Sequence, residues 1–74
     1  MNNKKKVFER VRDMAHSLLE DGYMIRININ ISTCCFIKLK HRKNSNVITI
    51  VGSYDKSVIR LFRNGKLRHE ELIK

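Results

Sequence analysis

The stretch Tyr23–Arg42 decides the fold, and it reads YMIRININISTCCFIKLKHR. Isoleucine occupies every second position from Ile25 to Ile31, and apolar and polar residues alternate again from Ile37 to Lys40. There, Lys38 and Lys40 share one parity with Phe36. Because successive side chains of a strand point to opposite faces of a sheet, the stretch predicts two strands. The three-residue segment Ile31–Thr33 is expected to join them into a hairpin.

Two further segments carry the composition of strands. Val47–Val51 and Ser57–Arg63 are rich in β-branched or aromatic residues, and turn-forming residues precede each of them. No helical pattern occurs between the four predicted strands, so residues 23–63 are expected to form a four-stranded antiparallel meander.

A helix is predicted over residues 7–21, before the sheet. Apolar residues recur there at three- and four-residue spacing and form one stripe. Gly22 follows the last of them, at a position where a left-handed helix cap favours glycine. The helix should pack on one face of the sheet in an α+β domain, with Leu18 and Ile27 in its core. The stripe consists of Val7, Val11, Met14, Ala15, Leu18 and Leu19.

A single domain, 1–74, is expected, and its two ends lie outside the predicted helix and strands. Residues 1–6, MNNKKK, are expected to form a flexible basic tail. In residues 64–74, NGKLRHEELIK, the preferred prediction is a turn followed by about two helical turns, since HEELIK contains good helix formers. Asn64-Gly65 is also a strong hairpin signal, which leaves a returning strand as the alternative.

Face parity suggests a register for the sheet. Pairing Ile29 with Cys35 places Arg26 directly opposite Lys38 on the solvent face, where like charges repel. The same scheme pairs Leu39 with Ile50 and Ile50 with Ile59. No acidic residue of the four strands lies on that face, so the face is expected to be a binding site for phosphates.

The charge balance is the strongest functional signal. Sixteen Lys and Arg residues oppose seven Asp and Glu residues, which gives a net charge of +9. Such an excess favours polyanions through the release of counterions. No apolar run approaches the roughly 20 residues of a membrane span, so no membrane partner is expected. The adjacent Cys34 and Cys35 suggest a reducing cytoplasm, and the many Lys, Asn and Ile residues suggest an AT-rich genome such as that of a phage or mobile element.

These observations predict a nucleic-acid-binding protein of weak sequence preference. Cations that follow a phosphate backbone, together with aromatic rings on which bases stack, are typical of sites for single-stranded RNA or DNA. The predicted binding residues are Arg26, Phe36, Lys38, Lys40, Arg42, Arg60, Phe62, Arg63 and Lys66.

Other interpretations stay open. The same face could be covered by the C-terminal segment, or by a second subunit in a homodimer formed through the sheet face or an edge strand. A protein-interaction module, such as a phage-type inhibitor that docks on an acidic protein surface, is the second functional hypothesis. A small ribonuclease using a histidine (His16, His41 or His69) with Glu70 or Glu71 is a weaker one, and no enzymatic activity is expected. No cofactor or metal is expected, because adjacent cysteines on a strand point to opposite faces.

Overall fold

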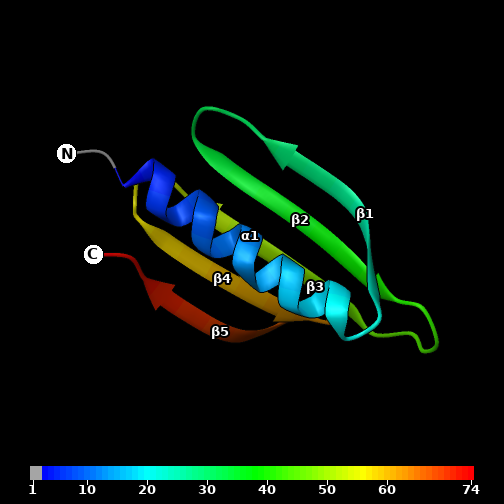
Figure 1. Ribbon diagram of the computed structural model, residues 1–74. Helices are drawn as coiled ribbons and strands as arrows, with labels where there is room; N and C mark the ends of the chain where they lie inside the picture. The colour runs from blue at the N-terminus through cyan, green and yellow to red at the C-terminus, as the bar shows by residue number, and fades with distance from the viewer. Residues whose placement is uncertain (1–2) are drawn as a thin grey trace.

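One helix covers one face of a five-stranded antiparallel sheet (Figure 1). The computed structural model describes residues 3–74. Each strand pairs with its neighbour in the sequence, which gives the order β1-β2-β3-β4-β5. The α+β class and the meander are therefore confirmed, whereas the expected number of four strands is wrong. The elements are α1 (Lys4–Glu20), β1 (Tyr23–Asn30), β2 (Cys34–His41), β3 (Val47–Ser53), β4 (Val58–Arg63) and β5 (Lys66–Leu72).

Helix α1 begins three residues earlier than predicted. Lys4–Lys6 belong to its first turn, so the expected flexible tail is wrong for them, while Met1 and Asn2 lie outside the described residues. Asn3 fixes this end of the helix, because its side-chain amide donates to Ser57 Oγ (3.1 Å) and to the Ile73 carbonyl (3.3 Å). At the other end the helix stops as predicted, with Gly22 at φ 98°.

The core lies between the helix and what we call the inner face of the sheet, the face that the helix covers. The helical stripe contributes Val7, Val11 and Ala15, which are all at most 3% exposed. Gly52 of β3 lets the helix approach closely, since a Cβ atom there would lie 2.8 Å from Val7 Cγ1. The sheet contributes Cys35, Ile37, Leu39, Ile48, Ile50 and Ile59 to this core, and Tyr54 completes it.

A β-bulge at Arg26 overturns the predicted register of the first hairpin. Ile25 pairs with Leu39 as alternation requires, but the next pair is Ile27 with Lys38, so Arg26 has no partner on β2. Beyond the bulge the faces are exchanged, and Ile29 lies opposite Phe36 instead of Cys35. Two isoleucines predicted for the core therefore lie on the outer face, the face opposite the helix.

The next two hairpins keep the predicted faces but shift by two residues. Leu39 pairs with Ile48 rather than Ile50, and Ile50 pairs with Leu61 rather than Ile59. A shift of two preserves parity, because side chains alternate with a period of two. The assignment of side chains on β2, β3 and β4 to inner and outer faces is consequently correct.

The C-terminal segment forms a strand instead of the expected helical turns. Asn64 and Gly65 both have positive φ values, 51° and 84°, which is the geometry of the type I′ turn that joins β4 to β5. Asn64 is also fixed from the side, because Val47 N donates to its Oδ1 at 2.8 Å. The hairpin signal thus overrides the helix propensity of HEELIK.

Candidate nucleic-acid interface

The outer face of the sheet carries most of the predicted binding residues. No described element lies over it, because α1 packs on the inner face and β5 extends the sheet beside β4. The alternative in which the C-terminal segment covers this face is therefore wrong. By register, the outer face consists of Met24, Ile27 and Ile29 of β1, Cys34, Phe36, Lys38 and Lys40 of β2, Val47, Thr49, Val51 and Ser53 of β3, Val58, Arg60 and Phe62 of β4, and Leu67, Glu70 and Leu72 of β5.

Two lysines give this face its free positive charge. Lys38 is exposed and lies between Ile27 and Thr49, and Lys40 is exposed beside Val47. The expected opposition of Arg26 and Lys38 does not occur, because Arg26 stands exposed in the bulge at the edge of the sheet. Each lysine therefore has uncharged strand neighbours, which leaves its ammonium group available to an anion.

The third cation of the face, Arg60, is paired. Its Nε donates to Glu70 Oε2 at 2.6 Å, from β4 to the adjacent β5. The expectation that this face has no acidic residue is thus wrong, and the reason is the unpredicted fifth strand. Both side chains are about half exposed, so the pair contributes little to stability. Its main effect is to reduce the positive charge on the β5 side of the face.

The two predicted aromatic residues lie on the outer face and are partly exposed. Phe36 has Ile29 and Val51 as strand neighbours, and Phe62 lies between Thr49 and Leu67. They are separated by β3 and offset by two residues, so strand spacing and rise put their Cα atoms roughly 12 Å apart. Each ring can therefore contact a different part of one ligand.

Three predicted residues lie at the end of the sheet rather than on its face. Arg42 follows β2, and its backbone N–H donates to the Gly22 carbonyl at 3.0 Å. Arg63 and Lys66 flank the Asn64-Gly65 turn as a strand pair, at positions that share the parity of the inner face. All three are exposed. They form a basic end to the sheet and lie outside its outer face.

Large aliphatic side chains on the outer face are what sequence reasoning missed. Ile27 and Ile29 are 41% and 47% exposed, and Leu67 and Leu72 are 51% and 65% exposed. The bulge placed the first two there, and no sequence signal marks it. The Asn64-Gly65 hairpin signal could have found the other two. The face is accordingly more apolar than predicted.

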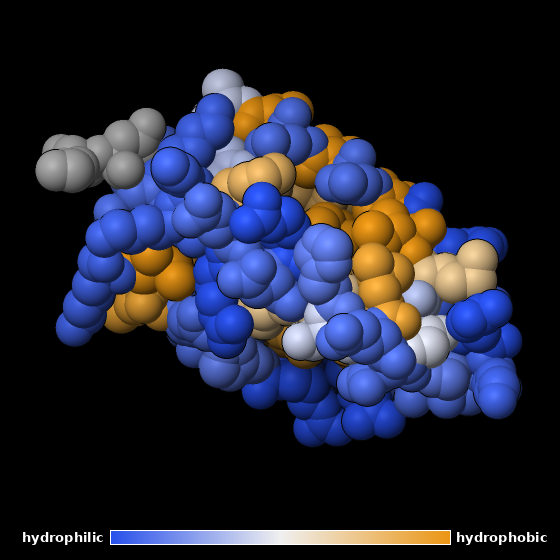
Figure 2. Space-filling view, in the orientation of Figure 1, coloured by the Kyte–Doolittle hydropathy of each residue, from blue (hydrophilic) through white to orange (hydrophobic). Residues whose placement is uncertain are grey.

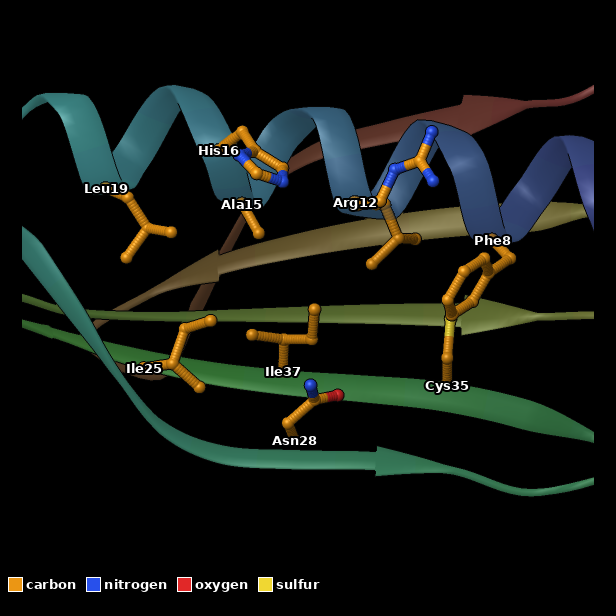
Figure 3. A pocket seen from close by; sticks show the side chains of 10 residues that line it. Phe8, Arg12, Ala15, His16, Leu19, Ile25, Asn28, Cys35 and Ile37 are labelled. Atoms are coloured by element: carbon orange, nitrogen blue, oxygen red, sulfur yellow. The ribbon is translucent and has the colours of Figure 1, made fainter.

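The inner face is also incompletely covered. A groove of about 240 Å³ runs between α1 and β1, with Phe8 and Leu19 on the helix side and Ile25 on the strand side (Figure 3). These three side chains are each about 40% exposed, and Figure 2 shows hydrophobic surface alongside the helix. One helix is too narrow for five strands, so β1 is exposed on both faces over most of its length, from Met24 to Asn30.

Histidine, acid and arginine meet on the opposite edge. Arg10 Nε of α1 donates to Glu71 Oε2 at 2.8 Å, and His69 Nε2 lies 2.9 Å from Glu71 Oε1. The hydrogen bond from Arg10, and then that with His69, holds the pKa of Glu71 below its usual value. A carboxylate so held is a weaker base than usual, and the cluster ties the helix to β5. It therefore adds no support to the ribonuclease hypothesis.

Acid should weaken this tie. Since the pKa of Glu71 is lowered in the folded state, its contribution is present above the ordinary carboxyl value of 4.5 and is lost as pH falls through the folded pKa. Glu71→Gln should lower the free energy of unfolding by about 0.5–1 kcal/mol at neutral pH, because the pair is largely exposed. Denaturation curves should show that difference vanishing below the folded pKa. A difference that persists unchanged in acid would contradict the ion pair.

The fold and the site together define a class: a small, basic α+β protein with an open sheet face on which lysines and apolar side chains are mixed. No protein-family model matches the chain, and no curated protein or solved structure is significantly similar to it. Within residues 3–74, no three His, Cys, Asp or Glu side chains are grouped so that they could hold a metal ion. The helix of this part of the chain is not long and apolar enough to cross a membrane.

Proposed function

We propose that this protein binds single-stranded nucleic acid through the outer face of its sheet, with weak sequence preference. The observation that carries the proposal is the presence of Lys38 and Lys40 on the same uncovered face as Phe36 and Phe62. Lysines contact phosphates irrespective of sequence, and aromatic rings accept any base. The adjacent, free Cys34 and Cys35 fit a reducing compartment, and we place the protein in the cytoplasm.

The basic end of the sheet extends this interface. Lys40 lies near the end of β2, two residues before Arg42. Arg63 and Lys66 lie at the same end of the sheet, on the turn of the β4–β5 hairpin, and β3 separates them from β2. A strand bound across the outer face can continue over this end, where further phosphates meet cations. The proposal therefore places bases near Phe36 and Phe62, and the flanking backbone near Lys40 and the turn.

An acidic protein surface is the second candidate ligand. The exposed Ile27, Ile29 and Leu67 favour it, because large exposed apolar groups on a sheet mark protein interfaces. Such a partner would still need to match Lys38 and Lys40. The affinity of the protein for single-stranded RNA, single-stranded DNA and an acidic polypeptide separates a nucleic-acid ligand from a protein ligand.

Removing Lys38 and Lys40, the two lysines of the outer face, should weaken binding to single-stranded oligonucleotides. If four to six phosphates are contacted, the log–log slope of affinity against salt should be about −3 to −5 for the unchanged protein. Lys38→Ala/Lys40→Ala should reduce the magnitude of that slope by about 1.4–1.8, since each phosphate contributes ~0.7–0.9. Fluorescence anisotropy over a series of salt concentrations measures both quantities.

The matched control is Lys5→Ala/Lys56→Ala. It removes the same charge from two exposed positions on α1 and the β3–β4 turn, away from the outer face. Phe36→Ala should in addition cost about 1–3 kcal/mol of binding free energy if a base stacks on the ring. Equal losses of affinity in the Lys38→Ala/Lys40→Ala and Lys5→Ala/Lys56→Ala variants would show that only net charge matters. A salt slope near zero for the unchanged protein would refute nucleic-acid binding.

A further inference from the structure

The C-terminal half of the free edge of β1 lacks the features that normally prevent strand pairing. Its bulge lies at Arg26, before the segment Ile27–Ile31, which reads ININI and consists of the last four residues of β1 and the residue that follows them. That segment contains neither a charge nor a proline, and Ile27, Ile29 and Ile31 are 41%, 47% and 53% exposed. Natural sheets usually protect such edges with charges, prolines or bulges. An unprotected, aliphatic edge indicates a pairing surface.

The opposite edge of the same sheet shows the protection that β1 lacks. β5 reads KLRHEEL, and four of its seven residues are charged. A bulge interrupts it as well, because Leu61 pairs with His69 while Phe62 pairs with Leu67. The two edges of one small sheet thus differ in charge, and the part of β1 after its bulge is an uncharged, regular strand that another chain can pair with.

The backbone of this segment is correctly phased for pairing. Ile31 N donates to the Cys34 carbonyl at 2.9 Å, so the amide of Ile31 points toward β2. Backbone groups alternate in direction along an antiparallel strand, which turns the N–H and C=O groups of Asn28 and Asn30 toward the free edge. These groups can form hydrogen bonds with a further antiparallel strand.

The segment is complementary to itself. ININI reads the same in both directions, so antiparallel pairing about Ile29 places each residue opposite one of its own kind. Asn28 of one copy then meets Asn30 of the other, and each such pair exchanges two backbone hydrogen bonds. Two copies with a net charge of +9 repel each other over most of their surfaces, but this segment is uncharged.

We propose that two copies of this chain pair antiparallel through Ile27–Ile31 about a two-fold axis at Ile29. The two five-stranded sheets become one continuous sheet with both helices on the same side. The occupant is a second copy rather than an acidic peptide, because an uncharged palindromic segment offers such a peptide no complementary charge. Pairing joins the two outer faces, so that Phe36 and Ile29 of each copy form one apolar row across the axis.

Two matched substitutions test the edge. Ile29→Lys and Leu72→Lys each replace an exposed aliphatic residue of the outer face, one on the β1 edge and one on the β5 edge. Light scattering should give twice the 8.8 kDa mass of the chain for the unchanged protein and for Leu72→Lys, and the single mass for Ile29→Lys. The proposal would be overturned if the unchanged protein had the mass of one chain even at high concentration. It would also be overturned if Leu72→Lys gave the mass of one chain while Ile29→Lys still gave twice that mass.

Cross-linking tests the register independently. In a Cys34→Ser background, Ile29→Cys puts two thiols opposite each other at the axis, where Cα atoms of a non-hydrogen-bonded pair lie about 4.5 Å apart, within disulfide range. Ile27→Cys puts its two thiols four residues apart along the strands, or roughly 13 Å. Oxidised glutathione should cross-link the first variant and leave the second monomeric on a non-reducing gel. Equal cross-linking of both would reject this register. Neither result depends on whether nucleic acid binds.

Discussion

Replacing Gly52 by valine should destabilise this protein more than any other single change at a glycine. A Cβ atom at this position would lie 2.8 Å from Val7 Cγ1, 2.9 Å from Cys35 Sγ and 3.1 Å from Val11 Cγ2. All three neighbours are at most 2% exposed, so none can move aside without disturbing the core. Overpacking of this kind costs about 1–3 kcal/mol and occasionally more. For valine we expect at least ~3 kcal/mol, a large part of the stability of a small domain.

Thermal and chemical denaturation measure this effect, and Gly65→Ala is its control. Nothing lies within 4 Å of a Cβ atom at Gly65, whose φ is 84°. Its replacement should therefore cost only the backbone strain of a left-handed position, about 1–2 kcal/mol. Gly52→Ala should fall between the two. A melting temperature unchanged by Gly52→Val would mean that the helix does not pack on β3 at this point.

The second large effect is expected at Leu39, with Ile27 as the contrasting position. Leu39 of β2 is fully buried, and Leu39→Ala should lower the free energy of unfolding by about 2–5 kcal/mol because it leaves a cavity. Ile27 is 41% exposed on the outer face, so Ile27→Ala should cost less than ~1 kcal/mol in the separate chain. Sequence reasoning placed Ile27 in the core, and a loss of about 2–5 kcal/mol would be expected there for a buried isoleucine.

Urea denaturation at low protein concentration distinguishes the two variants. Low concentration matters because pairing of β1 with a second copy would add stability at Ile27. The bulge at Arg26 would be refuted if Ile27→Ala proved as damaging as Leu39→Ala, since Ile27 would then belong to the inner face.

The bulge also shows where sequence reasoning had to fail. Alternating isoleucine and asparagine looks the same whether or not one residue is skipped, so local pattern contains no signal for it. The bulge turns Asn30 to the inner face, where it makes a long-range contact: the Tyr54 hydroxyl, from the loop after β3, donates to Asn30 Oδ1 at 2.7 Å. Burial raises the pKa of Tyr54, and its hydroxyl needs this acceptor. An asparagine on the inner face supplies it, where the predicted register had no polar group.

The C-terminal strand was missed for a different reason. HEELIK favours a helix only by the small differences of intrinsic propensity, a few tenths of a kcal/mol per residue. The Asn64-Gly65 turn and the pairing of this segment with β4, which includes the Arg60–Glu70 salt bridge at 2.6 Å, oppose this helix propensity. Tertiary pairing prevailed, and it brought an acidic residue to a face predicted to have none.

The central part of the candidate interface was predictable because β2 and β4 are regular where it lies. Phe36, Lys38 and Lys40 share a parity that no bulge on β2 disturbs, and Arg60 and Phe62 share one on β4. Arg26 was misplaced because it is itself the bulged residue. Parity is thus a sound guide to a site on central strands and a poor one on edge strands, where the ladder is held from one side only.

The contacts of Asn3 and Lys6 with the last two residues determine how the molecule would respond to mechanical tension. Asn3 contacts the Ile73 carbonyl, and Lys6 Nζ donates to the Lys74 carbonyl at 3.2 Å, so a force applied at the two ends first separates these contacts. The load then reaches the open end of the β4–β5 hairpin, at the pair Val58 and Leu72. There the strands are peeled apart one rung at a time instead of being sheared along their whole length. Pulled in this way, the protein should unzip from its C-terminal strand under weak force, while the helix and the central strands stay together.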